Sequence, residues 1–366
     1  MIVPELPDYL RSMGGEKYIG LIIALFTTTA GLSRPFSGKL TDTIGRMPVQ
    51  IVGTLVCVVA GLIYPFVSSV FAFLLLRLFH GFSTGFKPTA TTAYLADVVP
   101  VNRRGEAMGI LGVSMNLGAS IAPPIGSYLA QEHSLDHMFY CSSAIALVSV
   151  LMLFGMKETL AEKQKFSPSL LKLGRHDIID KSALLPASIA LVVYLSIGAL
   201  VTIGPDQSVY LGVSNKGFFF TSYTLCSVLS RLVAGRMSDK FGRIKVLRIS
   251  ILLLCFALLF FALVDSPMMF LLAAGFLGFS MGTASPPIFA WVIDRCQDEN
   301  RGKALATVYI ALEISIGFGA LFSGWFYNSD PSRFGMTFIM LAGFTSIGLL
   351  ILFNRKDHVE NVSTKE

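Results

Sequence analysis

The sequence predicts an all-helical membrane protein made of two related helical bundles, and three observations support this prediction. The 366 residues are 53% hydrophobic and only 14% charged, whereas soluble domains carry about 25% charged residues. Eleven apolar runs are each long enough to cross a bilayer. The second half of the chain repeats the first at a constant offset of 197 residues.

The composition also excludes several classes of function. A soluble protein could not hide this much apolar surface, so the lipid bilayer is the expected partner. The net charge of +6 is explained by basic loops on one side of a membrane, and nucleic acid is not expected as a partner. The five cysteines lack the spacing of a disulfide framework or a metal site. No phosphate-binding loop or catalytic triad is visible, so neither an enzyme activity nor a cofactor is predicted.

The apolar runs are predicted to be transmembrane helices, because a helix satisfies its own backbone hydrogen bonds in lipid. Strands are not expected, since the runs are long and do not alternate between apolar and polar residues. The runs cover approximately residues 18–37, 48–67, 70–94, 107–130, 138–156, 183–204, 217–234, 246–264, 267–293, 304–327 and 334–353.

The basic residues predict how the helices are oriented. One set of loops holds nearly all lysines and arginines outside the apolar runs and is therefore predicted to be cytoplasmic. These loops lie at 38–48, 95–106, 157–182, 235–248 and 294–303. The opposite loops carry only four cations, Arg11, Lys17, Lys216 and Arg333.

This pattern divides the chain into four segments. Residues 1–156 are an N-terminal half and residues 183–354 a C-terminal six-helix half. A cytoplasmic central loop, 157–182, joins them, and 355–366 is a cytoplasmic tail. The central loop has apolar residues among its charges, which predicts a short helix lying on the membrane surface. They are Leu170, Leu171, Leu173, Ile178 and Ile179.

The internal repeat indicates the architecture. The offset of 197 residues pairs Arg34 with Arg231, Gly38 with Gly235, Asp42 with Asp239, Arg46 with Arg243, Gly81 with Gly278, Gly85 with Gly282 and Asp97 with Asp294. No gap is needed over about 70 residues. Two parallel halves with a ligand path between them are a known plan of secondary transporters.

The same offset predicts that the first helix is truncated. The span at 183–204 should have its equivalent at about −14 to 7, and only Met1 to Pro7 is present. We therefore expect eleven full spans, and a longer product whose start lies upstream of Met1. The alternative is a true eleven-helix fragment that transports poorly.

Several motifs resemble those of the major facilitator superfamily. The segments from Gly38 to Arg46 and from Gly235 to Arg243 resemble the family's loop 2–3 and loop 8–9 signatures. Arg77 with Gly81 and Gly85 resembles its fourth-helix motif. The segment Gly118-x-x-x-Ala122-Pro123-Pro124-x-Gly126 is similar to the fifth-helix motif of drug:proton antiporters, although that family usually has Gly at positions 122 and 127.

This resemblance implies a gating role for the repeated loop residues. It places Asp42, Arg46 and Asp97 in a cytoplasmic latch that breaks when the inner gate opens, with Gly38 allowing helix ends to approach. Gly235, Asp239 and Arg243 would form the second copy. The alternative is that these charges serve only to orient the loops.

Polar residues within the fourth span predict a cavity wall. Arg77, His80, Thr84, Lys87 and Thr91 share one face of a helix, and an ionisable group at membrane depth suggests a functional site. The equivalent positions of the tenth span are apolar: Ala274, Leu277, Met281, Ala284 and Ile288. We expect a cavity with one cationic and one apolar wall. Alternatively, Arg77 and Lys87 neutralise acids between helices and His80 binds a backbone carbonyl.

Glu313 is the second intramembrane charge, near the middle of the eleventh span, and its repeat equivalent is the polar Asn116. A buried carboxylate without a compensating cation binds protons readily, which suits proton coupling. The alternative is a fixed salt bridge to Arg77 or Lys87. For Arg34 and Arg231 a structural role is predicted, either in reaching the cytoplasmic surface or in pairing with Asp97 and Asp294.

The sequence therefore predicts a secondary transporter that moves a small molecule by alternating access. We expect a monomer in a bacterial cytoplasmic membrane that uses a proton gradient to export an amphipathic or anionic compound. The alternatives are a proton symporter that imports a sugar or organic acid, and an inactive truncated fragment.

Overall fold

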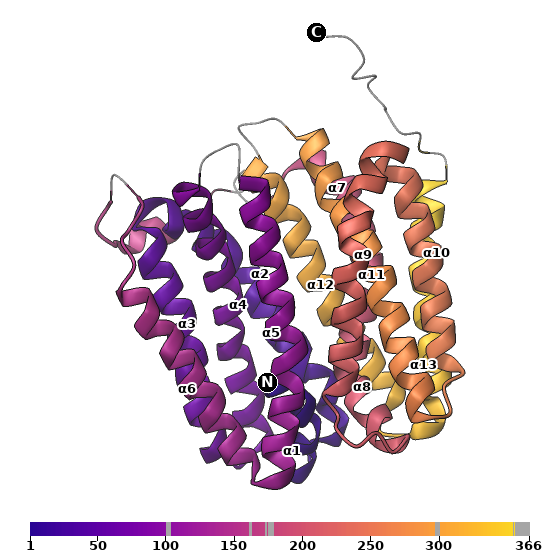
Figure 1. Ribbon diagram of the computed structural model, residues 1–366. Helices are drawn as coiled ribbons and strands as arrows, with labels where there is room; N and C mark the ends of the chain where they lie inside the picture. The colour runs from indigo at the N-terminus through magenta and orange to yellow at the C-terminus, as the bar shows by residue number, and fades with distance from the viewer. Residues whose placement is uncertain are drawn as a thin grey trace.

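The computed structural model describes residues 1–99, 104–160, 163–172, 174, 179–296, 301–353 and 355. In these residues all regular structure is helical, and the helices form two bundles that stand side by side (Figure 1). The tail from 356 onward lies outside the described residues.

The N-terminal bundle begins with a 3₁₀ turn, η1 (Val3–Glu5), and the short helix α1 (Leu6–Ser12). Five long helices follow: α2 (Ile19–Thr43), α3 (Arg46–Ile63), α4 (Val70–Val98), α5 (Arg104–Glu132) and α6 (Leu135–Phe154). The C-terminal bundle contains α7 (Leu184–Val193), α8 (Leu195–Tyr210), α9 (Phe218–Phe241), α10 (Arg243–Ala262), α11 (Pro267–Arg295), α12 (Arg301–Tyr327) and α13 (Phe334–Leu352).

The prediction that the apolar runs are helical is confirmed. Each apolar run lies in one helix, except that the run at 183–204 is divided into α7 and α8 at Tyr194. Nine helical segments of the described chain are long and apolar enough to cross a membrane. The 29-residue helices α4 and α5 are not among those nine. α4 contains Arg77 and Lys87, which lower its hydropathy.

The sequence repeat is also a repeat of contacts. A Cβ atom added to Gly81 would overlap the carbonyl of Phe26, and one added to Gly278 would overlap the carbonyl of Tyr223, which is 197 residues after Phe26. Small residues at these positions bring α4 against α2 and α11 against α9. Gly85 and Gly282 make equivalent contacts with Ser33 and Ser230.

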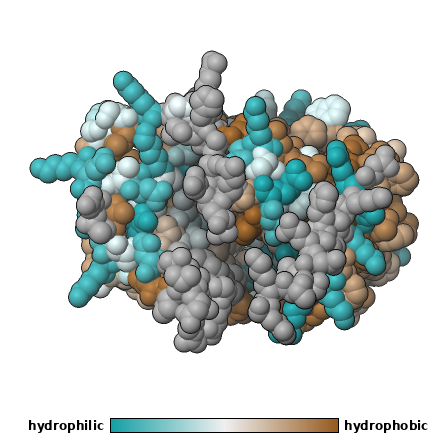
Figure 2. All heavy atoms as spheres, turned by 90° about the horizontal axis from the view of Figure 1, so that it is seen from above, coloured by the Kyte–Doolittle hydropathy of each residue, from teal (hydrophilic) through white to brown (hydrophobic). Residues whose placement is uncertain are grey.

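Large apolar side chains cover the sides of both bundles. Phe71, Phe154, Leu229, Trp325 and Leu350 are each more than half exposed, as are many others along the helices. Such a surface is stable in lipid and not in water. Hydrophilic side chains project instead from the end of the molecule seen in Figure 2. The chain is therefore an integral, multi-pass membrane protein.

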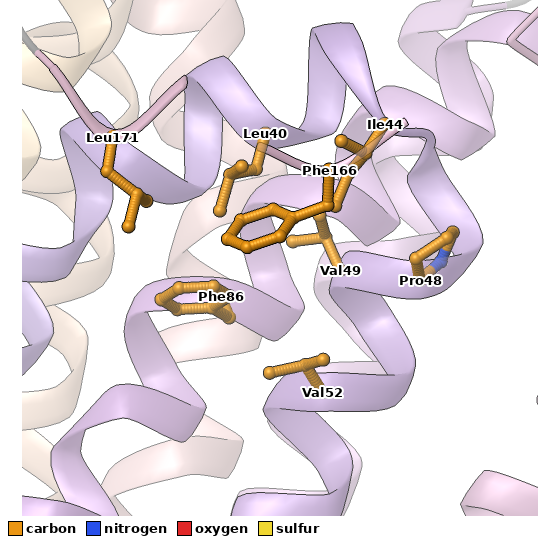
Figure 3. A pocket seen from close by; sticks show the side chains of 8 residues that line it. All are labelled: Leu40, Ile44, Pro48, Val49, Val52, Phe86, Phe166 and Leu171. Atoms are coloured by element: carbon orange, nitrogen blue, oxygen red, sulfur yellow. The ribbon is translucent and has the colours of Figure 1, made fainter. Parts of the chain in front are cut away.

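The described part of the central loop contains the 3₁₀ turn η5 (Pro168–Leu171) and the start of the 3₁₀ turn η7 (Lys181–Ala183). Leu173 and Ile178 of the predicted surface helix lie outside the described residues. Phe166 and Leu171 reach an apolar pocket of about 420 Å³ between α2, α3 and α4 (Figure 3). Its other lining residues are Leu40, Ile44, Pro48, Val49, Val52 and Phe86.

The predicted orientation can be tested with single cysteines at Thr43 and Lys240. Thr43 is the last residue of α2 and Lys240 lies in the last turn of α9, both at the basic-loop end. In intact cells both cysteines should resist an impermeant thiol reagent and react after the cells are made permeable. A cysteine at Lys17, at the opposite end, should react in intact cells. Labelling of the first two in intact cells would contradict the orientation.

Candidate functional site

A cavity of about 1320 Å³ lies between the two bundles. Its N-terminal wall is formed mainly by α2 and α4, and its C-terminal wall by α8 and α12. The lining extends to Lys39, Asp42 and Ala93, near the basic-loop ends of α2 and α4, and Asp42 is exposed. The cavity is therefore open at this end, which is called here the open end. At the other limit it stops at apolar residues such as Ile23, Val201 and Ile316.

Of the five polar residues that share one face of α4, Arg77, His80 and Thr84 line the cavity. Arg77 is 2% exposed. Its Nε donates to the carbonyl of Ile22 at 2.8 Å, its Nη1 donates to the hydroxyl of Tyr64 at 3.2 Å, and its guanidinium lies 4.5 Å from the ring centre of Phe26. Arg77 has no carboxylate partner among the described residues, so the proposal that it neutralises an acid finds no support there.

Lys87 and Asn116 do not line the cavity, which corrects their predicted placement. Lys87 Nζ donates to Ser149 of α6 at 3.3 Å, and Asn116 donates to its own helix at the carbonyl of Gly112. Past Pro88 the cavity is lined by Thr89 and Thr92. The face of α4 that meets the cavity therefore rotates at the proline, whereas an ideal helix keeps one face throughout.

The apolar wall also lies elsewhere than predicted. The five apolar residues of α11 that are equivalent to the polar face of α4 are buried in the core of the C-terminal bundle and do not line the cavity. They are Ala274, Leu277, Met281, Ala284 and Ile288. α11 packs against α9 and α10. The apolar wall comes instead from Ile197 and Val201 of α8 and from Leu312 and Ile316 of α12.

Glu313 lines the cavity and forms an ion pair, but its partner is neither Arg77 nor Lys87. Arg34 Nη2 lies 2.6 Å from Glu313 Oε1, which joins α2 to α12 across the two halves. The side chains are 11% and 6% exposed. For Arg34 the sequence predicted a pair with Asp97 or extension to the cytoplasmic surface, whereas the structure shows an ion pair with Glu313. An arginine one turn before a loop can extend inward as well as toward the surface, and sequence spacing does not decide between the two directions.

The latch residues form the same ion pairs in both halves. Arg46 Nε lies 3.0 Å from Asp97 and its Nη1 2.8 Å from Asp42. In the second copy, Arg243 Nε lies 2.9 Å from Asp294 and its Nη1 pairs with Asp239. These pairs connect helix ends within each half. Their equivalence supports a structural role beyond loop orientation.

The latch is intact although the cavity is open at this end. The expectation that it breaks on inner opening therefore does not fit this state. Gly38 and Gly235 likewise have no atom within 4 Å of an added Cβ. These two glycines thus do not bring helix ends together while the halves are apart.

Glu158 of the central loop caps the start of α3. Its carboxylate accepts hydrogen bonds from the backbone N–H groups of Arg46, Met47, Thr159 and Leu160 at 2.9–3.0 Å. Partial burial by itself would raise the pKa of Glu158, but these N–H groups favour the ionised form and lower that pKa below its ordinary value. Gly45, with φ of +123°, leaves the space that the carboxylate occupies.

We expect this cap to make the stability of the protein pH-dependent. Because the folded-state pKa of Glu158 is lowered, the cap contributes fully above the ordinary value of 4.5 and is lost as the pH falls through the folded value. Glu158→Gln should lower the melting temperature at pH 7 and abolish this part of the acid sensitivity. The control is Glu16→Gln at the opposite end, which should change neither. Equal acid sensitivity in wild type and Glu158→Gln would contradict the expectation.

The opposite end of the cavity is closed by five charged residues that the sequence analysis did not assign. We call Glu5, Asp8, Arg11, Asp206 and Lys216 the closed-end cluster. Arg11 pairs through both terminal nitrogens with Asp206 of α8. Lys216 of the α8–α9 loop pairs with Glu5 at 3.1 Å and with Asp8. Both sets of pairs join the N-terminal half to the C-terminal half.

Three side chains of the closed-end cluster are largely buried. Asp206 and Glu5 are 5% exposed at their side chains, and Lys216 is 11% exposed. Burial would lower the pKa of Lys216, but the adjacent carboxylates of Glu5 and Asp8 raise that pKa overall. One feature of the sequence could have indicated this cluster. Arg11 and Lys216 are two of only four cations at an end otherwise poor in basic residues.

Comparison with known proteins identifies the family. The sequence profile described as Major Facilitator Superfamily matches residues 1–203 and again residues 186–366. The chain belongs to the major facilitator superfamily. The first match covers the N-terminal half and extends through the run at 183–204, and the second covers nearly all of the C-terminal half.

Several similar curated relatives within the superfamily are named for multidrug resistance. The chain is 27% identical to a multi-drug resistance efflux pump PmrA homolog of Lactococcus lactis, over 79% of this chain and 74% of that protein. It is 27% identical to the multidrug resistance protein MdtG of Serratia proteamaculans, over 91% of each. The D-xylose-proton symporter structure shares the fold, with a TM-score of 0.78, 15% identity and coverage of 96% and 93%.

Proposed function

We propose that this major facilitator superfamily protein is a proton-coupled transporter that exports a small amphipathic or anionic compound by alternating access. The main support for this proposal is the cavity between the two halves. It is open at the basic-loop end, and at the other end ion pairs join the two halves. This is the arrangement expected of an inward-facing state. The relative named as a multi-drug resistance efflux pump favours the outward direction.

Glu313 is the proposed proton-binding residue. It lies at membrane depth, lines the cavity and contacts the opposite half through Arg34. A proton on Glu313 would weaken this contact between α2 and α12. Protonation could thereby change the relative stability of the two cavity orientations. The aromatic side chains of Phe26 and Tyr309 beside it would suit an amphipathic substrate.

A second candidate function is proton-coupled import of an organic acid. The observation that favours it is the charge of the deep cavity, where Arg34 and Arg77 face one carboxylate, Glu313. Both candidates use the same cavity and the same halves, and they differ in whether the proton and the substrate move in opposite directions or together.

The proposed function can be tested by measuring accumulation of labelled compounds in cells with and without this gene. The panel should contain amphipathic cations, neutral compounds and carboxylates. For export, cells with the gene should accumulate less of at least one compound, and a protonophore should abolish the difference. For import they should accumulate more. No protonophore-sensitive difference for any compound would contradict both candidates.

A further inference from the structure

The apolar pocket beneath the central loop lies apart from the cavity between the halves, and the two have no lining residue in common. It encloses about 420 Å³, and none of its lining side chains carries a charge or a hydrogen-bonding group. An ordered water needs two to four polar partners, so water is a poor occupant of such a space. The wall of this pocket therefore favours an apolar occupant.

The pocket is continuous with the lipid-facing surface of the N-terminal bundle. Val52 is 48% exposed and belongs to a row of exposed apolar residues on α3 that continues with Leu55 and Val59. On α4, Phe86 lines the pocket and lies 6.3 Å, between ring centres, from Phe82, which is 40% exposed. In a transmembrane helix such faces contact acyl chains. A lipid chain beside α3 and α4 can therefore reach the pocket.

The central loop is fastened to α2 above this pocket. The backbone N–H of Gln164 donates to the carbonyl of Thr43 at 2.8 Å. Farther along the loop, Lys39 Nζ donates to the carbonyl of Lys172 at 2.6 Å. Two hydrogen bonds thus hold both ends of the segment 164–172 at the basic-loop end of α2.

The apolar side chains of this segment cover the pocket without filling it. Figure 3 shows the ring of Phe166 directed across the pocket, with Leu171 at one side of it. Phe166 is nevertheless 58% exposed and Leu171 41% exposed. Exposed apolar groups of this size are typical of surfaces that contact a partner or a membrane. An apolar chain in the pocket would cover them from below.

Basic residues stand next to these apolar side chains. Between positions 157 and 175 the sequence has five basic and two acidic residues, and one of the acids, Glu158, caps α3. Lys163 and Lys165 are exposed just before Phe166. Neither lysine forms an ion pair with another described residue. Lysines at a membrane surface attract anionic lipids.

The internal repeat shows that this apolar wall is particular to the N-terminal half. The residues equivalent to Pro48 and Phe86 in the other half are Lys245 and Thr283, which are polar. A helix surface that only faces lipid would be expected in both halves. The apolar wall occurs instead in the half to which the central loop is fastened.

We propose that this pocket binds an acyl chain of an anionic phospholipid, whose phosphate lies beside Lys163 and Lys165. The chain enters from the lipid side of α3 and α4, and Phe166 and Leu171 cover it. Chain burial and headgroup charge are the two contributions that together give stable binding at a membrane surface. The site holds the central loop on the N-terminal half, and it makes no use of the cavity between the halves.

The test is photolabelling of the purified full chain in bilayers. The probe is a trace of phosphatidylglycerol with a diazirine in its acyl chain, in a host of phosphatidylcholine. Mass spectrometry measures label on the peptides that contain Val52, Phe86 and Phe166. The reference for general lipid contact is the peptide that contains Ile249, which is the repeat equivalent of Val52 and is 46% exposed. Pocket label should exceed the reference by about tenfold or more, and unlabelled phosphatidylglycerol added to the host should abolish the excess.

Two variants separate the chain from the headgroup. Val52→Trp fills the mouth of the pocket and should reduce pocket label to the reference level, whereas Ile249→Trp should leave it unchanged. Replacing Lys163 and Lys165 together with glutamine should lower the excess by about fivefold for each lysine.

The control for the second variant replaces Lys181 and Lys240 with glutamine. These exposed lysines lie at the same end of the molecule, beside and within the C-terminal half. This pair of changes should have no effect on pocket label.

Three results would overturn the proposal: pocket label no higher than the reference, label undiminished in Val52→Trp, or an excess that unlabelled phosphatidylglycerol does not displace. Thermal melting of each variant excludes loss of folding as the cause of a lower label. The measurement involves no transport, so its outcome is independent of the accumulation assay.

Discussion

Replacing Glu313 with glutamine is expected to abolish the response of transport to a pH gradient. The amide keeps the shape of the side chain but cannot bind or release a proton in the physiological range. For a coupling of one proton per substrate, wild type gains up to about tenfold in substrate ratio per unit of pH difference. The variant should show no gain. The measurement is substrate accumulation in proteoliposomes with an imposed pH step.

The matched control is Glu132→Gln, which changes an exposed carboxylate at the end of α5. It should transport as wild type does. If Glu313→Gln retains the full response to the pH step, Glu313 is a structural partner of Arg34 and the coupling proton binds another group.

Replacing Asp206 with asparagine is expected to open the closed end. The substitution leaves Arg11 partly buried opposite a neutral amide and removes its paired contact across the halves. The loss of a charged hydrogen bond costs about 1.5–3 kcal/mol. Because this pair exists only while that end is closed, the cost should shift the equilibrium toward the outward-open state by roughly 10- to 150-fold.

Cys57 provides a native reporter for this shift, since it lines the cavity. With the other four cysteines replaced, an impermeant thiol reagent should label Cys57 from the open end in the otherwise wild-type protein. In Asp206→Asn, labelling from the closed end should rise. The control is Asp330→Asn, which breaks an exposed pair with Arg333 at the same end but within one half. Unchanged labelling in Asp206→Asn would show that the closed-end cluster does not hold this end shut.

The first residues of the chain take part both in the N-terminal core and in the closed-end cluster. The N-terminal core is smaller than the C-terminal core and includes Leu6 and Leu10 of α1. Glu5 and Asp8 extend from the same short segment to Lys216. The segment formed by η1 and α1 thus supplies both apolar core residues and charges that join the halves.

The fold was predictable because its signals are local or periodic. Apolar length specifies a span wherever it occurs, since lipid leaves a helix no alternative. A repeat at constant offset specifies two equivalent halves, and the contacts of Gly81 and Gly278 reproduce it. The pairing of Arg46 with Asp42 and Asp97 was accessible for the same reason, since it is repeated 197 residues later.

The cavity required the tertiary structure, because its chemistry depends on which helices face each other across the halves. Sequence spacing placed Lys87 on the same helical face as Arg77, but the face of α4 that meets the cavity changes at Pro88. The partner of Glu313 lies 279 residues away on the other half, and nothing local distinguishes Arg34 from an arginine that reaches the surface. The sequence alone thus determined the helices, their repeat and the presence of charges within the membrane. Only the packing of one half against the other decided which charges meet, since side chains of like periodicity can face lipid, core or cavity.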